Sequence, residues 1–159
     1  MTKMKFNEEK ISKCIASLGG IGKLPASGTW GSVVALPFAW FLAGTWGLLF
    51  LVAASFILGV LTIRPLIDGK EEKDPSFVII DEFMGQLVVF SFIPSERITP
   101  ILLIFGFLFF RLFDILKPWP ASFFDRKVHN NWGVMLDDLA AGIYGFLALA
   151  FLELLSYYL

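Results

Sequence analysis

Residues 77–90 read FVIIDEFMGQLVVF, an apolar run that carries two adjacent acids, Asp81 and Glu82, near its start. A charged side chain inside a membrane is energetically costly, and it usually faces the interior of a helix bundle or a water-filled cavity. The stretch therefore predicts a membrane helix over about 77–93 with a polar site near one of its ends.

The composition of the whole chain agrees with a membrane protein. Of its 159 residues, 57% are hydrophobic and 17% are charged, whereas soluble domains average about 45–50% apolar and about 25% charged residues. This length suits a single domain over 1–159. A net charge of −1 and the lack of a basic tract argue against nucleic-acid binding. The single Cys14 excludes a disulfide within the chain.

The apolar segments divide into five helices. Residues 33–63 as one helix would measure roughly 46 Å, which exceeds the hydrocarbon core of about 30 Å. Because AGTWG at 43–47 interrupts this segment, we expect two helices there, the first of them short. The predicted membrane helices cover 33–43, 46–63, 77–93, 98–117 and 134–157. The fourth of these helices, 98–117, ends before Pro118, since proline disfavours helix in the residue before it.

The remaining segments are predicted to lie outside the lipid. Residues 8–18 place Ile11, Ile15 and Leu18 on one helical face, so we expect 1–18 to form an amphipathic helix at the membrane surface. The glycine-rich segment 19–32 is predicted to be an irregular loop. The expected fold class is therefore all-α, a polytopic membrane bundle over 19–157 with an N-terminal surface helix. Two further polar loops are expected over 64–76 and 118–133.

The basic residues predict the orientation of this bundle. If the N-terminus is cytoplasmic, all but two of the 13 Lys and Arg residues lie in the inner segments 1–32, 64–76 and 117–133. The two others are Arg97, on the outer side, and Arg111, within a helix. This asymmetry follows the positive-inside rule. In a four-helix alternative, with 33–63 as one span, the N-terminal lysines would lie on the opposite side of the membrane from the other two basic loops.

The same topology gathers polar residues of several helices at the inner face. They are Thr29, Ser32, Asp81, Glu82, Arg111, Asp114, Asp137 and Asp138. Clustered carboxylates repel one another unless a cation lies between them, and an all-oxygen site suits Mg²⁺ or Mn²⁺ better than Zn²⁺. Gly85 and Gly142 follow Asp81 and Asp138 by four residues, and such small residues allow two membrane helices to approach closely.

Separately, these residues have simpler explanations. Acids in the first turn of a helix stabilise its dipole, and Arg111 and Asp114, three apart, can form a structural ion pair. Together with Lys117 and Arg126, however, they make the combination of carboxylates, metal and cations that binds a phosphate group. The glycine-rich segment before 33 can add backbone donors. His129, the only histidine, is either a solvated loop residue or part of this site.

Five motifs carry a resemblance to a known family. LPASGTWGS (24–32), DEFMGQ (81–86), RLFDILKPWP (111–120), FDRKVH (124–129) and GVMLDDLAAG (133–142) resemble the phosphatidylglycerophosphatase A family over about residues 19–145. In the first motif Ser27 stands where the family usually has proline, whereas Gly28, Thr29, Gly31 and Ser32 agree with it. Matching acids are Asp81, Glu82, Asp114, Asp125, Asp137 and Asp138, and matching cations are Arg111, Lys117 and Arg126.

The resemblance implies an enzyme of the bacterial inner membrane, multi-pass, with its N-terminus and active site facing the cytoplasm. Such an enzyme removes the terminal phosphate of the phospholipid phosphatidylglycerophosphate with the help of Mg²⁺. We expect Asp81, Glu82, Asp137 and Asp138 to be the metal ligands, with Asp114 as a ligand or a supporting group. The residues expected to bind phosphate or substrate are Thr29, Ser32, Arg111, Lys117, Arg126 and His129.

Several alternatives stay open at this point. The nucleophile is either a water molecule or one of the acids, through a phospho-aspartyl intermediate. A divalent-cation or proton-coupled transporter would also use intramembrane acids, but it would need polar groups near the midplane. A CDP-alcohol phosphotransferase is disfavoured because Asp68-Gly69 is followed by KEEKDP. A membrane scaffold would leave the acids unexplained, and the oligomeric state is undetermined.

Overall fold

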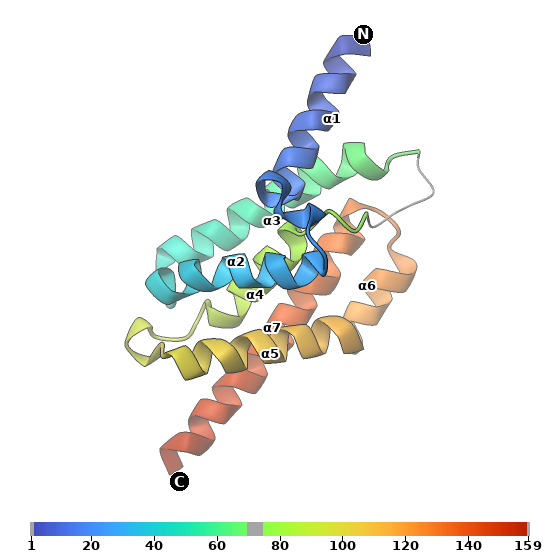
Figure 1. Cartoon of the computed structure of the whole chain (residues 1–159). Coiled ribbons are helices and arrows are strands. Elements are labelled where there is room, and N and C mark those ends of the chain that lie inside the picture. The colour runs from blue at the N-terminus through green and yellow to red at the C-terminus, as the bar shows by residue number, and fades with distance from the viewer. Residues whose placement is uncertain (1, 70–74, 159) are drawn as a thin grey trace.

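The computed structural model describes residues 2–69 and 75–158, and within them it is all-helical, as expected, with no strand. The helices are α1 (Thr2–Ala16), η1 (Leu18–Lys23), α2 (Ser27–Leu42), α3 (Trp46–Ile67), α4 (Ile80–Phe90), η2 (Ser95–Arg97), α5 (Pro100–Leu116), α6 (Ala121–Lys127) and α7 (Asn131–Tyr158). Figure 1 shows α1 projecting from one end of the bundle and the last turns of α7 projecting from the opposite end.

The expected start of the first bundle helix is wrong. Sequence analysis predicts an irregular loop over 19–32, but α2 already begins at Ser27. Positive φ angles, which favour glycine, occur at Gly19 and Gly20 (73° and 101°). Gly31, in contrast, lies within α2 and packs so closely that a Cβ there would come 2.7 Å from the carbonyl oxygen of Ile79. In the sequence, glycines that allow close helix packing cannot be told from glycines of a loop, and this is why the predicted start of α2 is wrong.

Other helix bounds also differ from expectation. The third bundle helix begins at Ile80 instead of 77, and the Ile79 N–H before it donates to the carbonyl of Ala16, 2.9 Å away. α3 continues past the expected end at 63 to Ile67. The predicted polar loop 118–133 contains a short helix, α6. Part of the other polar loop, 70–74 with Lys70 and Lys73, lies outside the described residues.

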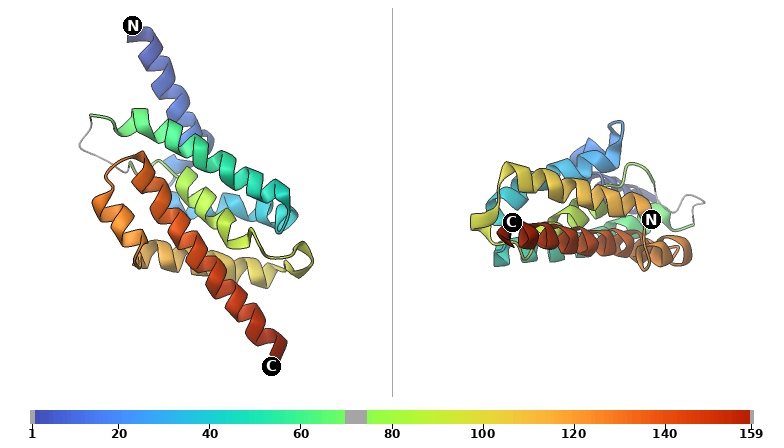
Figure 2. Two further views of the ribbon diagram at one scale, coloured as in Figure 1. Left: turned by 180° about the vertical axis from the view of Figure 1, so that it is seen from behind. Right: turned by 90° about the horizontal axis from the view of Figure 1, so that it is seen from below.

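Helix α4 is the centre of the bundle. All of its residues except Glu82 are buried, and it contacts α2, α3, α5 and α7. The back view in Figure 2 shows α4 between α3 and α5, with α7 crossing in front. Burial on every side explains why this segment, apart from Asp81, Glu82 and Gln86, is apolar on all its faces rather than on one.

Two described helices are long and apolar enough to cross a membrane, namely α3 over Trp46–Ile67 and α7 over Asn131–Ser156. The expectation of about five membrane helices is met only in part, since α4 has 11 residues and a span needs about 20. The outer surface is nevertheless strongly apolar. Phe41, Phe50 and Ile101 are 76%, 75% and 66% exposed, and exposed apolar surface of this kind marks contact with lipid or protein.

Helix directions bring four helix ends together. α2 and α4 run parallel, since a Cβ at Gly31 would touch Ile79 and one at Gly44 would touch Ile93. α7 runs parallel to α4, because Gly142 abuts Gly85 and Gly145 abuts Val89. α5 runs the opposite way, with Gly106 at Phe90 and Phe110 at Gly85. The N-terminal ends of α2, α4 and α7 therefore meet the C-terminal end of α5.

Candidate metal and phosphate site

Three carboxylates form an acidic trio at this end of the bundle: Asp81 and Glu82 in the first turn of α4, and Asp138 in α7. One oxygen from each lies within 4.8 Å of those of the others. Asp81 and Asp138 are buried, whereas Glu82 is partly exposed. Among the described residues this is the group of acids arranged to hold a metal ion.

Glycines allow the trio to form. A Cβ at Gly85 would come 2.7 Å from the carbonyl oxygen of Asp138, and one at Gly142 would come 2.9 Å from the Cβ of Val88. Both are closer than real side-chain contacts, so α4 and α7 approach at a distance that only glycine permits. The four-residue spacing of Asp81 to Gly85 and of Asp138 to Gly142 predicts this approach, and the structure agrees.

An ion pair on α5 borders the trio. Arg111 Nη1 lies 2.6 Å from Asp114 Oδ2, with both side chains mostly buried. Asp114 is close enough to Glu82 and Asp138 for their charges to interact. The predicted pairing of Arg111 with Asp114 is therefore present, and it lies beside the other acids rather than apart from them.

The first turns of α2 reach the same place. A Cβ at Gly28 would collide with the Glu82 carboxylate and would come 3.1 Å from Arg111 Nη1. Thr29 is partly exposed in this turn. Ser32 is fully buried, and its hydroxyl donates to the carbonyl of Gly28 at 3.1 Å. The glycine-rich motif thus brings the N-terminal end of a helix, which favours anions, against the acids and Arg111.

Four buried polar atoms at this site lack a hydrogen-bond partner among the described residues. They are Glu82 Oε2, Arg111 Nη1, and both side-chain amide atoms of Gln86. The ion pair of Arg111 with Asp114 is thus close but not aligned as a hydrogen bond. Because buried polar atoms are nearly always partnered in native proteins, this group of atoms indicates a site for a polar ligand.

Gln86 is a residue that sequence analysis did not single out. It is 0% exposed, and as the fourth residue after Glu82 it shares a helical face with that acid. A buried amide without partners costs about 1–3 kcal/mol, so its presence in the mostly apolar α4 points to a polar partner such as a water molecule or a ligand. The signal in the sequence was a polar residue one turn after the acids, within the DEFMGQ motif.

Lys117 joins three elements at the edge of the site. It is the C-cap of α5 with a left-handed φ of 43°, and its Nζ lies 2.6 Å from both Asp125 on α6 and Asp137 on α7. Burial alone lowers the pKa of Lys117, but the hydrogen bonds to Asp125 and Asp137 outweigh it, and the pKa is raised. Lys117 is therefore cationic at neutral pH, and Asp137, an expected metal ligand, contacts it instead of joining the trio.

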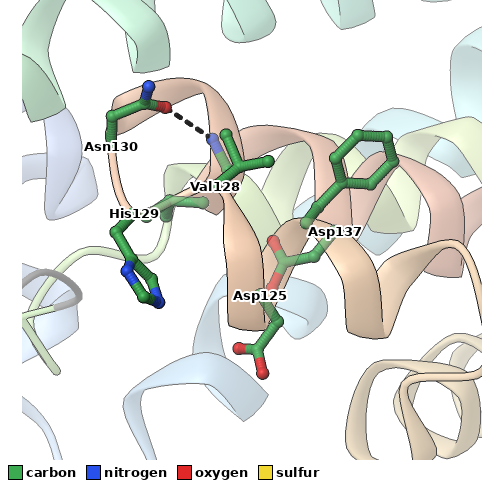
Figure 3. A pocket seen from close by; sticks show the side chains of 8 residues that line it. Asp125, Val128, His129, Asn130 and Asp137 are labelled. Carbon is green, nitrogen blue, oxygen red and sulfur yellow. Dashed lines mark hydrogen bonds between the residues drawn. The ribbon is translucent and has the colours of Figure 1, made fainter.

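The other expected residues lie at the rim. Arg126 and His129 are exposed, on α6 and in the loop that follows it. Figure 3 shows the small pocket of about 50 Å³ that His129 lines together with Asp125 and Asp137. Next to it, Asn130 Oδ1 accepts hydrogen bonds from the N–H groups of Trp132 and Gly133, which caps the start of α7.

Taken together, the geometry suits the chemistry of phosphate and a hard cation. Three carboxylates supply the oxygen ligands that Mg²⁺ and Ca²⁺ prefer. Arg111 and Lys117 place positive charge beside them, and Arg111 Nη1 and the Gln86 amide have no hydrogen-bond partner among the described residues. Of the expected metal ligands, the structure brings together Asp81, Glu82 and Asp138, while Asp114 and Asp137 border the trio in ion pairs.

A family model and two relatives of the chain carry the same name. The family model for phosphatidylglycerophosphatase A matches residues 14–153. A phosphatidylglycerophosphatase A from Haemophilus influenzae is 38% identical over 76% of this chain and 74% of its own length. The Escherichia coli protein of that name is 35% identical over 73% of this chain and 67% of its own.

A third relative has a different name. A protein from Bacteroides thetaiotaomicron, described as a candidate phosphatidylinositol-3-phosphatase, is 34% identical over 83% of this chain and 80% of its own length. No solved structure gives a significant match.

Proposed function

The chain belongs to the phosphatidylglycerophosphatase A family, and from that premise we propose that it hydrolyses phosphatidylglycerophosphate to phosphatidylglycerol and phosphate in a Mg²⁺-dependent reaction. Membership makes it a hydrolase acting on a phosphate ester. The names of its relatives support the phosphatidylglycerophosphatase activity itself.

The observation that carries the proposal is the acidic trio with its unpaired neighbours. Three carboxylates within 4.8 Å of one another repel unless a cation balances them. Glu82 Oε2, Arg111 Nη1 and the Gln86 amide are buried without a hydrogen-bond partner among the described residues, and they offer both acceptors and donors. A metal ion would bind the acceptor oxygens, and a phosphate group beside it would accept hydrogen bonds from the donors.

These residues fit Mg²⁺. Asp81, Glu82 and Asp138 would hold the ion, with Asp114 and Asp137 as additional acids nearby. Bound Mg²⁺ would supply Lewis acidity to a phosphate ester. The trio would also keep the ion at the end of the bundle, where the headgroup of a lipid can reach it while the acyl chains stay among the exposed apolar side chains.

The cations would bind the phosphate oxygens. Arg111, whose Nη1 lies 2.6 Å from Asp114 Oδ2 without a hydrogen bond, borders the trio, and phosphoryl transfer requires positive charge at these oxygens. Lys117 would add charge while holding Asp125 and Asp137 in place. Thr29 and Ser32, at the N-terminal end of α2, would help to position the phosphate, and the exposed Arg126 and His129 would contact the headgroup from the rim.

Two routes lead to the same products. A water molecule can attack phosphorus directly, or one of the acids can attack first and form a phospho-aspartyl intermediate. Acid quenching during turnover of substrate with a radiolabelled terminal phosphate separates them. Label retained on a carboxylate of the protein supports the second route, and unlabelled protein at full turnover supports the first.

We further propose that the chain is one domain embedded in the inner membrane through five helices, with residues 1–18 at the surface and the site facing the cytoplasm. The apolar exterior and the two helices of spanning length support this placement. The bias of Lys and Arg toward one side supports the orientation. The short α4 is enclosed by its neighbours, so it need not span the bilayer by itself.

Phosphate release by the purified protein in detergent tests the function. Release from phosphatidylglycerophosphate should require Mg²⁺, stop with EDTA and be lost in Asp81→Asn. Glu96→Gln, which changes an exposed acid of η2 at the opposite end of the bundle, should keep full activity. Phosphatidylinositol 3-phosphate serves as the comparison substrate.

Three outcomes would count against this account. No release by folded protein in Mg²⁺ would contradict the phosphatase function and return attention to cation or proton transport. Release that survives EDTA would contradict the metal requirement. Faster release from the inositol lipid would contradict the proposed substrate.

A further inference from the structure

A second cavity lies at the same end of the bundle, away from the acidic trio. It has a volume of about 450 Å³ and lies between α1, η1 and Phe77, within the range of about 300–1,000 Å³ typical of ligand sites. Lys10, Lys13 and Lys23 line it, and none of its described lining residues is an acid. We call it the lysine pocket.

Backbone geometry builds this pocket. α1 ends at Ala16, and the chain then reverses through Leu18, Gly19 and Gly20, all with positive φ. The reversal brings Lys23 back beside Lys10 and Lys13, which lie three residues apart on one face of α1. The pocket is therefore a product of the fold and not of one helix surface.

The pocket is connected to the helix that carries the trio. The Ile79 N–H donates to the Ala16 carbonyl at 2.9 Å, and the Ser27 hydroxyl donates to the Ser76 carbonyl at 2.5 Å. A Cβ at Gly22 would collide with the carbonyl of Phe77. Phe77, a wall of the pocket, thus lies on the segment that leads directly into Asp81.

The charges in the pocket are mostly uncompensated. Lys13 makes a long ion pair with Glu9, 3.4 Å between Nζ and Oε1, and the two side chains are 53% and 39% exposed. Lys10 and Lys23 have no ion pair among the described residues. Surface ion pairs of this kind are weak, so the pocket presents a net positive charge against the apolar wall of Phe77.

We propose that the lysine pocket binds the phosphate group of an anionic phospholipid, at a position distinct from the catalytic site. Lysines bind phosphate as point charges, and basic residues next to a membrane attract anionic lipids. The apolar wall suits the glycerol backbone and the first methylenes of such a lipid. The inference rests on the proposed function only in placing the protein in a membrane that contains anionic lipid.

The single Cys14 reports on occupancy of the pocket. It is exposed and lines the pocket. In the detergent-solubilised full chain, the rate of Cys14 labelling by a small maleimide is measured alone, with short-chain phosphatidylglycerol, with phosphatidylcholine of equal chain length, and with inorganic phosphate. Anionic lipid at ten times its dissociation constant should slow labelling about tenfold. Phosphatidylcholine should leave the rate unchanged.

Variants identify the groups responsible. The double variant Lys10→Gln/Lys23→Gln should lose the protection, measured as the ratio of its own rates with and without lipid. Arg97→Gln, which removes an exposed cation on η2, should keep it. Equal slowing by phosphatidylcholine, or protection that survives the double variant, would overturn the proposal. Full protection by inorganic phosphate, with no gain from lipid, would overturn the assignment to a lipid.

The catalytic variant separates this inference from the proposed function. Asp81→Asn leaves the lysine pocket intact and should show full protection by phosphatidylglycerol. Protection in a protein that releases no phosphate from any lipid would support the pocket and contradict the proposed function. Phosphatase activity without protection of Cys14 would contradict the pocket alone.

Discussion

The carboxylates of Asp81, Glu82 and Asp138, within 4.8 Å of one another, repel when no cation balances them. We therefore expect Asp138→Asn to raise the melting temperature in EDTA, because it removes one buried negative charge. The same change should abolish stabilisation by Mg²⁺ and lower activity at least about 100-fold. Even the replacement of a group that only supports a metal ligand lowers metal affinity or activity about 10–100-fold.

Thermal unfolding with and without Mg²⁺, followed by phosphate release, checks this expectation. Glu153→Gln, which changes an acid of α7 outside the trio, is the control and should keep the Mg²⁺ response of the unchanged protein. An Asp138→Asn protein that Mg²⁺ still stabilises would show that the ion, if it binds, does so elsewhere.

Gln86 offers a second test at the scale of one residue. Its amide is buried and unpaired, and replacing such a group by an apolar one of similar size is nearly neutral or stabilising. Gln86→Leu should therefore keep or raise stability, by up to about 1–3 kcal/mol. If the amide contacts the substrate, kcat/KM should fall about tenfold, which corresponds to about 1.4 kcal/mol.

Denaturation and steady-state kinetics on the same preparation separate the two effects. Ser91→Ala is the matched control, because Ser91, the C-cap residue of α4, is also buried but its hydroxyl already donates to the Leu87 carbonyl at 3.1 Å. Unchanged kinetics in Gln86→Leu would show that the Gln86 amide does not contact the substrate.

At the scale of helices, the contact between α4 and α7 decides whether the trio exists. In Gly85→Ala the new Cβ would press on the Asp138 carbonyl at 2.7 Å and on the ring of Phe110. Overpacking of this kind costs about 1–3 kcal/mol, and relief of the clash moves Asp81 away from Asp138. We expect lower stability together with a weaker response to Mg²⁺.

Gly47→Ala is the control for this change, and both variants are compared by thermal unfolding over a series of Mg²⁺ concentrations. A Cβ at Gly47 has its nearest neighbour at an ordinary 3.4 Å, and alanine favours helix over glycine by about 0.5–1 kcal/mol. Gly47→Ala should therefore be neutral or stabilising. A Gly85→Ala protein that behaves the same way would mean that α4 and α7 can separate without consequence for the site.

At the scale of the whole molecule, the number of membrane crossings is open to a direct test. If α2, α4 and α5 cross together with α3 and α7, the η2 turn lies on the opposite side from α6. If only α3 and α7 cross, the two lie on the same side. Single cysteines Ser95→Cys and Ser122→Cys, each in a Cys14→Ser background, distinguish these arrangements in oriented membranes.

A membrane-impermeant maleimide applied from the periplasmic side is expected to label Ser95→Cys and not Ser122→Cys. Opened membranes should give labelling of both, which controls for reactivity. Labelling of both or of neither in intact membranes would contradict the five-helix arrangement, although the site at the ends of α4, α5 and α7 would be unaffected.

Much of the fold and of the site followed from the sequence alone. Long apolar runs specify helices, since a buried or lipid-facing backbone must satisfy its own hydrogen bonds. The positions of Asp81, Arg111 and Asp138 near the ends of such runs predict one polar end of the bundle. The spacing from Asp81 to Gly85 and from Asp138 to Gly142 predicts that two helices approach there. All of these are properties of short segments, which is why the sequence reveals them.

Only the tertiary structure decided which acids meet. Asp137 and Asp138 are neighbours in sequence, but successive residues point about 100° apart around a helix, so the packing of α7 determines their partners. It turns Asp138 toward Asp81 and Glu82 and turns Asp137 toward Lys117. The start of α2 at Ser27, the burial of Gln86 and the lysine pocket likewise depend on contacts between distant segments. Such contacts leave no periodic signal in a single sequence, because each depends on how two helices are rotated and spaced against each other.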